Sequence, residues 1–136
     1  MNQAFGYTRD DDRLELTSSV QLTRIMGLVA AYGWDFTENF HDQAEAWLEP
    51  VHQRPEGARL IEAASQGDTV FVYSAACLSY SATDFARAVE WFHRKRVSVV
   101  LVSETLRLAK NAGGNPLDLT KDLALEIFDR AMEGRL

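Results

Sequence analysis

The sequence predicts an α/β fold in which helices alternate with the strands of a mainly parallel sheet. Segments 70–73 and 97–102 are short, almost continuously apolar runs rich in β-branched residues. Such runs are typical of strands that are buried on both faces of a parallel sheet. The segments before and between them carry apolar residues at helical spacing, and this alternation indicates crossover connections of the usual right hand.

The N-terminal third predicts a strand, a turn, a helix and a second strand. The first strand covers 4–8 and runs into Arg9 and the three aspartates at 10–12, which indicate a turn. A helix is predicted from about Leu14 to Gly33, because its apolar residues recur at helical spacing. These residues are Leu22, Ile25, Met26 and Val29. The second strand is predicted over 34–42, where aromatic and polar residues alternate.

The middle of the chain predicts a loop followed by a helix. Residues 43–53 are acidic and include Pro50, which favours an exposed loop. Arg54-Pro55 opens the helix, since proline is tolerated in the first turn, and Gly67 is expected to close it. The buried face of this helix is expected to carry Leu60, Ile61 and Ala64.

A further helix is predicted between the two buried strands. Ser81 with Asp84 three residues later is typical of a helix start, and Ser81 is interpreted as a cap rather than a nucleophile. Ser79 has the same interpretation. Apolar positions on the buried face are Phe85, Val89 and Phe92. The basic run 93–96 is interpreted as cations that complement the negative end of this helix.

The C-terminal part predicts a flexible loop at 110–114 and an amphipathic helix from about Pro116 or Thr120 to Met132. Its apolar stripe consists of Leu123, Ala124, Ile127, Phe128 and Ala131. That stripe could pack on its own sheet or on another subunit, and both alternatives stay open.

Composition indicates one globular domain that covers residues 1–136, with no appended DNA-binding domain. There is no apolar run of about 20 residues and no signal-like N-terminus, which favours a cytoplasmic protein. The net charge is −6, and no Lys or Arg lies between Arg24 and Arg54. This charge is the wrong sign for a general binder of the phosphate backbone. Cys77 is the only cysteine, and no paired zinc ligands occur, so no cofactor or metal is expected.

Several short motifs appear together in a specific order. They are Tyr7-x-Arg9, Gln21, Arg54-Pro55, Gly67-Asp68, Leu78-Ser79-x-Ser81 with Asp84, and Val102-Ser103-Glu104. This series resembles the N-terminal catalytic domain of the resolvase/invertase family of serine recombinases over about residues 4–130. The resemblance implies a three-layer, flavodoxin-like fold with helices on both faces of the sheet, and a homo-oligomer such as a helix-mediated dimer. It also implies DNA cleavage by a serine after the first strand, with arginines around the phosphate.

The positions that match the family's active site depart from that pattern. Arg9, Gln21 and Arg54 match family positions, but Asp11 stands where the nucleophilic serine is expected. Residues 76–81 read Ala-Cys-Leu-Ser-Tyr-Ser where the family has Asp-Arg-Leu-Ser-Arg-Ser, so two arginines and an aspartate are missing. Three adjacent aspartates at 10–12 would repel a phosphate. Arg9 and Arg54 could be remnants of a phosphate site or could pair with these aspartates, and the adjacent acidic residues favour the pairing.

The leading hypothesis is a degenerate catalytic domain, linked by descent to DNA recombination, that does not exchange strands. It would act as a protein-interaction or accessory module through its last helix, and its DNA binding would be weak when it acts alone. Two alternatives stay open: an active recombinase that uses another serine, and a Mg-dependent phosphohydrolase that uses Asp10 and Asp12. Of the tryptophans, Trp34 and Trp91 are expected on packing faces, and Trp47 is a candidate anchor for a partner protein.

Overall fold

The computed structural model describes residues 3–14, 16–43, 49–103 and 106–107. A five-stranded sheet with the order β2-β1-β3-β4-β5 forms its centre. The strands are β1 (Ala4–Arg9), β2 (Phe36–Asp42), β3 (Thr69–Val72), β4 (Ser98–Leu101) and β5 (Leu106–Arg107). The first four are mutually parallel, and β5 runs antiparallel to β4. The predicted α/β fold with a mainly parallel sheet is thus confirmed.

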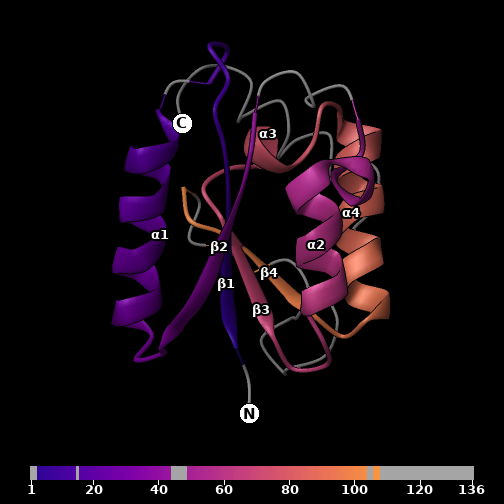
Figure 1. Cartoon of the computed structure of the whole chain (residues 1–136). Coiled ribbons are helices and arrows are strands. Elements are labelled where there is room, and N and C mark those ends of the chain that lie inside the picture. The colour runs from indigo at the N-terminus through magenta and orange to yellow at the C-terminus, as the bar shows by residue number, and fades with distance from the viewer. Residues whose placement is uncertain (1–2, 15, 44–48, 104–105, 108–136) are drawn as a thin grey trace.

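The helices lie on both faces of the sheet. They are α1 (Ser18–Ala31), the 3-10 turn η2 (Val51–Gln53), α2 (Pro55–Ala63), α3 (Ala75–Leu78) and α4 (Ala82–Arg94). Among the described residues, Figure 1 shows α1 on one face of the sheet and the pair α2 and α4 on the other, which gives three layers. The carboxyl ends of the parallel strands point toward the top of that view. Ligands of open α/β sheets bind outside these strand ends.

Strand β1 is the structural centre, since β2 and β3 flank it and all six of its residues are buried. The larger apolar cluster, which includes Phe85 and Phe92, lies on the side of α2 and α4. The smaller cluster lies under α1 and includes Ile25 and Phe71. Because β1 is buried on both faces, residues that follow it directly are held in a defined place.

Helix α1 begins four residues later than predicted. Thr17 is its N-cap and accepts a hydrogen bond from the backbone of Val20 at 3.4 Å, so the helix starts at Ser18. The residues before it form a turn in which the backbone N–H of Leu14 donates to the carbonyl of Asp11 at 2.9 Å. Met26, expected on the buried face, is 47% exposed and lies on the outer side of the helix.

The prediction of an exposed loop over 43–53 is wrong at its end. Val51 is 1% exposed and lies in η2, where it packs against the larger core cluster. A side chain at Gly57 would meet the carbonyl oxygen of Val51 at 2.1 Å, so this close approach of η2 to α2 requires glycine. Residues 44–48, including Trp47, lie outside the described residues.

Helix α4 begins as predicted, because the Ser81 side chain accepts a hydrogen bond from the backbone N–H of Asp84 at 3.1 Å. Phe85, Val89 and Phe92 are buried, as expected. Trp91 is not on a packing face, since it is 42% exposed. The predicted loop at 110–114 and the terminal helix lie outside the described residues. Within the described part of the chain, no helix has the length and apolar character needed to cross a bilayer.

Candidate functional site

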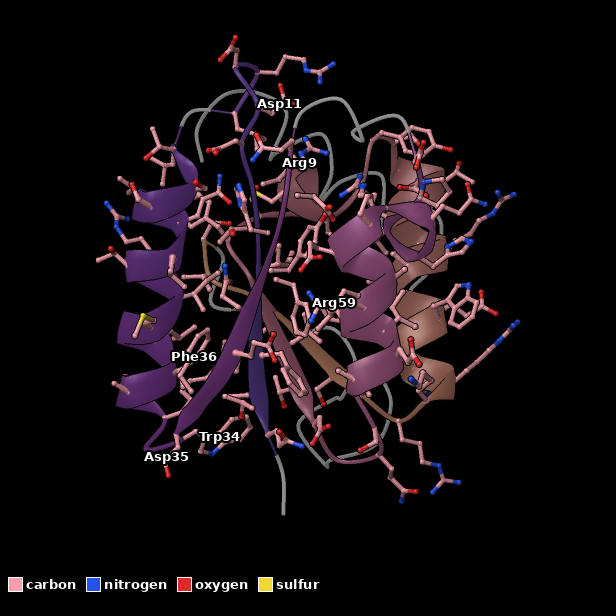
Figure 2. The ribbon with its side chains drawn as sticks, in the orientation of Figure 1. Arg9, Asp11, Trp34, Asp35, Phe36 and Arg59 are labelled. Atoms are coloured by element: carbon pink, nitrogen blue, oxygen red, sulfur yellow. The ribbon has the colours of Figure 1, made fainter. Side chains whose placement is uncertain are left out.

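A group of charged and polar side chains gathers at the carboxyl ends of β1, β2 and β3. Arg9 ends β1 and is in register with Asp42, which ends β2. Asp11 follows in the next turn, and the short helix α3 with Cys77 follows β3. Figure 2 shows Arg9 and Asp11 together at this edge, at the opposite end of the molecule from Trp34 and Phe36.

The centre of the site is an ion pair between Arg9 and Asp11. Nη2 of Arg9 lies 3.2 Å from Oδ2 of Asp11, and these side chains are only 3% and 2% exposed. Burial lowers the pKa of Arg9, and the nearby charge of Arg54 lowers it further. The Asp11 carboxylate therefore supplies the negative charge that this buried guanidinium needs.

Arg13 holds the same carboxylate from the solvent side. Its Nε and Nη2 donate to Oδ1 and Oδ2 of Asp11 at 2.8 and 2.6 Å, a bidentate arrangement. The backbone N–H of Arg13 donates to Oδ1 as well, at 2.9 Å. Burial alone would raise the pKa of Asp11, but the hydrogen bonds from Arg13 and the charge of Arg9 outweigh it and lower that pKa. Asp11 is thus an ionised, fully engaged carboxylate.

The two flanking aspartates differ from Asp11. Asp10 accepts a hydrogen bond from the backbone N–H of Ser18 at 3.2 Å and lies 3.3 Å from Nε2 of His41. Hydrogen bonding by Ser18 lowers the pKa of Asp10. Asp12 is exposed. Across the described ranges, no cluster of three or more His, Cys, Asp or Glu residues is arranged to hold a metal ion.

Gln21, which matches a family position, is completely buried and holds the backbone of Arg9. Its Oε1 accepts from the N–H of Arg9 at 3.1 Å, and its Nε2 donates to the carbonyl of Arg9 at 2.8 Å. Nε2 also donates to the carbonyl of Leu16 at 3.0 Å. The amide thereby joins the start of α1 to the end of β1 and orients the first residue of the site.

The expected pairing with the aspartates holds for Arg9, but the arrangement of Arg54 differs from the prediction. Arg54 is 0% exposed and directly precedes α2. Its Nε donates to the carbonyl of Glu49 at 2.9 Å. Its Nη1 donates to the hydroxyl of Tyr7 at 3.0 Å and the carbonyl of Cys77 at 3.3 Å. These contacts join η2, β1 and α3, so Arg54 lies in the interior rather than against the aspartate turn.

Sequence reasoning missed the role of Asp42. Its carboxylate accepts from the backbone N–H groups of Glu56 and Gly57 at 3.0 and 2.9 Å and from the hydroxyl of Tyr7 at 2.8 Å. Helix α2 has Arg54 at its N-cap, which makes no side-chain cap, so Asp42 supplies the cap from another strand. Burial raises the pKa of Tyr7, which remains a neutral donor. The sequence showed an aspartate at the end of a predicted strand and a helix start without a capping residue, but no local motif joins the two.

The segment that replaces the family's arginines provides no exposed nucleophile. Cys77 is 1% exposed, and its Sγ lies 3.4 Å from Oγ of Ser74. Burial raises the pKa of the Cys77 thiol, which favours the unreactive protonated form. Ser79 ends α3 and is buried, and Ser81 is the cap of α4.

In the described part of the chain, Nε and Nη1 of Arg9 are buried without a hydrogen-bond partner.

The fold and this site define a three-layer α/β domain with a polar cluster at the carboxyl edge of its sheet. The chain belongs to the resolvase family: the family model "Resolvase, N terminal domain" matches residues 6–130. No curated protein sequence matches the chain. The family resemblance seen in the motifs is thus confirmed.

Solved structures agree with this fold. The crystal structure of the N-terminal catalytic domain of TP901-1 integrase is 22% identical, with a TM-score of 0.71, and the match covers 99% of this chain and 100% of that one. A resolvase family site-specific recombinase from Streptococcus pneumoniae is 12% identical, with a TM-score of 0.66 and coverage of 98% and 89%. The C-terminal catalytic domain of ISC1926 TnpA, an IS607-like serine recombinase, is 18% identical, with a TM-score of 0.58 and coverage of 74% and 67%.

Proposed function

We propose that this chain is a resolvase-family catalytic domain that no longer exchanges DNA strands and acts as an accessory, protein-binding module in DNA recombination. The observation that carries the proposal is the buried ion pair between Arg9 and Asp11. By the family resemblance, Asp11 occupies the position of the nucleophilic serine. A carboxylate there both replaces the hydroxyl and places a negative charge against Nη2 of the guanidinium that a phosphate would need.

The chemistry of strand exchange argues for the same proposal. Catalysis of phosphoryl transfer requires cationic donors that are aimed at the charge of the transition state. Arg9 is committed to Asp11, and Arg54 is buried with carbonyl and hydroxyl partners. Attack by an aspartate would give an acyl phosphate, which hydrolyses and does not conserve the bond for religation. The remaining groups therefore suit a structural role better than a catalytic one.

The accessory role is supported by family membership and by charge. Family membership links the chain to DNA recombination, whereas a net charge of −6 opposes binding to the phosphate backbone by this chain alone. A partner protein that itself binds DNA, contacted through the predicted terminal helix, would resolve this conflict. We place the protein in the cytoplasm, where such a partner would act.

A cleavage assay tests the loss of activity. The purified chain is incubated with supercoiled plasmid, quenched with detergent and examined for nicks and for covalent protein-DNA adducts, with an active serine recombinase on its own site as positive control. We expect neither product from the wild type or from Asp11→Ser, because Ala76, Cys77 and Tyr80 still stand where the charged groups are needed. An adduct formed by the wild-type chain would refute the proposal.

Co-expression tests the accessory role. The tagged chain is co-expressed with an active resolvase-family recombinase and purified, and we expect the recombinase to co-purify in a defined ratio. A deletion that ends the chain at residue 115 removes the predicted terminal helix and is expected to abolish the association. Equal recovery of the recombinase with an untagged control would contradict this role without affecting the cleavage result.

A further inference from the structure

A groove lies between η2 and α4, on the outer flank of the molecule and apart from the Arg9 site. Its volume is about 320 Å³, and its walls are formed by Pro50 to His52 on one side and by one face of α4 on the other. Figure 1 shows α4 at the edge of the layer that it shares with α2. Neither Arg9 nor Asp11 lines this groove, and the volume is at the lower end of the range for small-molecule pockets.

One end of the groove is an aromatic platform. Trp91 is 42% exposed, and its ring stacks on that of His52 with centroids 5.4 Å apart and an interplanar angle of 23°. His52 belongs to η2, and its neighbour Val51 packs in the core. The core therefore fixes the position of the His52 ring in the stack. Because one face of Trp91 is already covered by a planar ring, a planar ligand ring could extend the stack.

Two arginines lie beside this platform, and they differ in whether another side chain pairs with them. Arg87 and Arg94 are four residues before and three residues after Trp91, so all three lie on one side of α4. Arg94 is paired with Glu90 at 2.5 Å. Within the ranges that the structure describes, no hydrogen bond or ion pair engages Arg87. Arg87 is therefore the guanidinium that is available to a ligand.

Asp84 also lines the groove, and its carboxylate is engaged in hydrogen bonds within the protein. Asp84 is 4% exposed, and its Oδ2 accepts from the backbone N–H of Tyr80 at 3.2 Å. Its own N–H donates to the cap residue Ser81 at 3.1 Å. Asp84 thus stabilises the start of α4, which leaves Arg87 as the lining guanidinium that can pair with a ligand.

We propose that this groove binds a planar heteroaromatic ring that carries one anionic group, of the size of a mononucleotide. The ring stacks on Trp91, and the phosphate pairs with the planar fork of Arg87. One available cation among the described residues that line the groove suits one anionic group rather than a long strand. The net charge of −6 would also oppose a polyanion.

Isothermal titration calorimetry with 2′-deoxyadenosine 5′-monophosphate tests the proposal, with deoxyadenosine and inorganic phosphate as separate titrants. We expect saturable binding of the nucleotide with one site per chain, and weaker binding of the nucleoside and of phosphate. Trp91→Ala should weaken nucleotide binding about tenfold or more, as loss of a stacking ring does elsewhere. Trp91→Tyr, which keeps a ring, should retain most of the affinity.

Two further variants separate the roles. Arg87→Gln should weaken binding of the nucleotide and leave binding of deoxyadenosine unchanged. Met26→Ala removes an equally exposed apolar side chain from α1, on the opposite face of the sheet, and should have no effect. The proposal is overturned if the nucleotide shows no saturable binding, if Trp91→Ala binds as tightly as the wild type, or if deoxyadenosine or phosphate alone binds as tightly as the nucleotide.

Discussion

The guanidinium of Arg9 lies 3.2 Å from the carboxylate of Asp11, and each side chain is almost completely buried. The backbone of Arg9 is held at the same time by the side-chain amide of Gln21, which bonds both its N–H and its carbonyl. Arg9 is thus fixed by its main chain and by its charge. Removing one partner of a buried ion pair destabilises the fold, because the other charge is left buried without a partner and without hydration.

Acid should weaken the fold partly through Asp11. The folded-state pKa of Asp11 is lowered relative to the unfolded chain, so its contribution to the free energy of unfolding is present above an unfolded pKa of about 3.9 and is lost as pH falls through the folded pKa. Asp11→Asn should therefore lose less stability than the wild type between about pH 5 and pH 2. Urea unfolding across this range measures the effect. Asp12→Asn, which removes an exposed carboxylate of the same turn, is the control with the same change in charge.

Replacement of Gln21 should destabilise the junction of β1 and α1. Gln21→Leu keeps the volume but leaves the buried N–H and carbonyl of Arg9 and the carbonyl of Leu16 without these partners. We expect a loss of about 2–4 kcal/mol in the free energy of unfolding, measured by urea denaturation. Thr23→Ala on the exposed side of α1 is the control. A loss as small as that of the control would mean that Gln21 does not hold Arg9.

Tyr7→Phe should reveal the link between Asp42 and Arg54. The hydroxyl of Tyr7 donates to Asp42 at 2.8 Å and accepts from Arg54 at 3.0 Å, and its removal leaves both buried groups short of a partner. A loss of about 1–3 kcal/mol is expected from chemical denaturation. Tyr80→Phe removes the same atom from a half-buried ring and should change stability much less. Equal losses in the two variants would contradict the network.

Ser81→Ala should lower stability by about 1 kcal/mol, because the cap of the N-terminus of α4 is lost. Thr83→Ala, in the first turn but exposed, is the matched comparison. A thermal or urea unfolding series measures both. If Ser81→Ala were neutral, the capping interpretation of Ser81 would be wrong.

Much of the fold was predictable because hydrophobic periodicity reports burial directly. The β-branched run at 70–73 overlaps β3, and the run at 97–102 contains β4. The spacing of Phe85, Val89 and Phe92 predicted the buried face of α4. The first residue of α1 was harder to predict from the sequence. Apolar spacing extended back to Leu14, but the hydrogen bonds of the Asp11 turn and the Thr17 cap make the helix begin later, at Ser18.

Long-range contacts explain what the sequence did not predict at the site. Local charge suggested that Arg54 would pair with the aspartates at 10–12, whereas its Nη1 bonds Tyr7, 47 residues away, and Cys77, 23 residues away. Asp42 caps α2 across 14 and 15 residues, a relationship that no local motif encodes. The pairing of Arg9 with Asp11 was predictable because the two are only two residues apart.

Anion binding by Arg9 tests the central claim most directly. The Nε–H resonance of Arg9 is followed by NMR during a sulfate titration of the wild type, Asp11→Ala and Asp12→Ala, two variants with the same change in charge. We predict a saturable shift in Asp11→Ala alone, because only this change frees the guanidinium from its carboxylate. A wild-type protein whose Arg9 binds sulfate as tightly as that of Asp11→Ala would contradict the claim that Asp11 occupies the site.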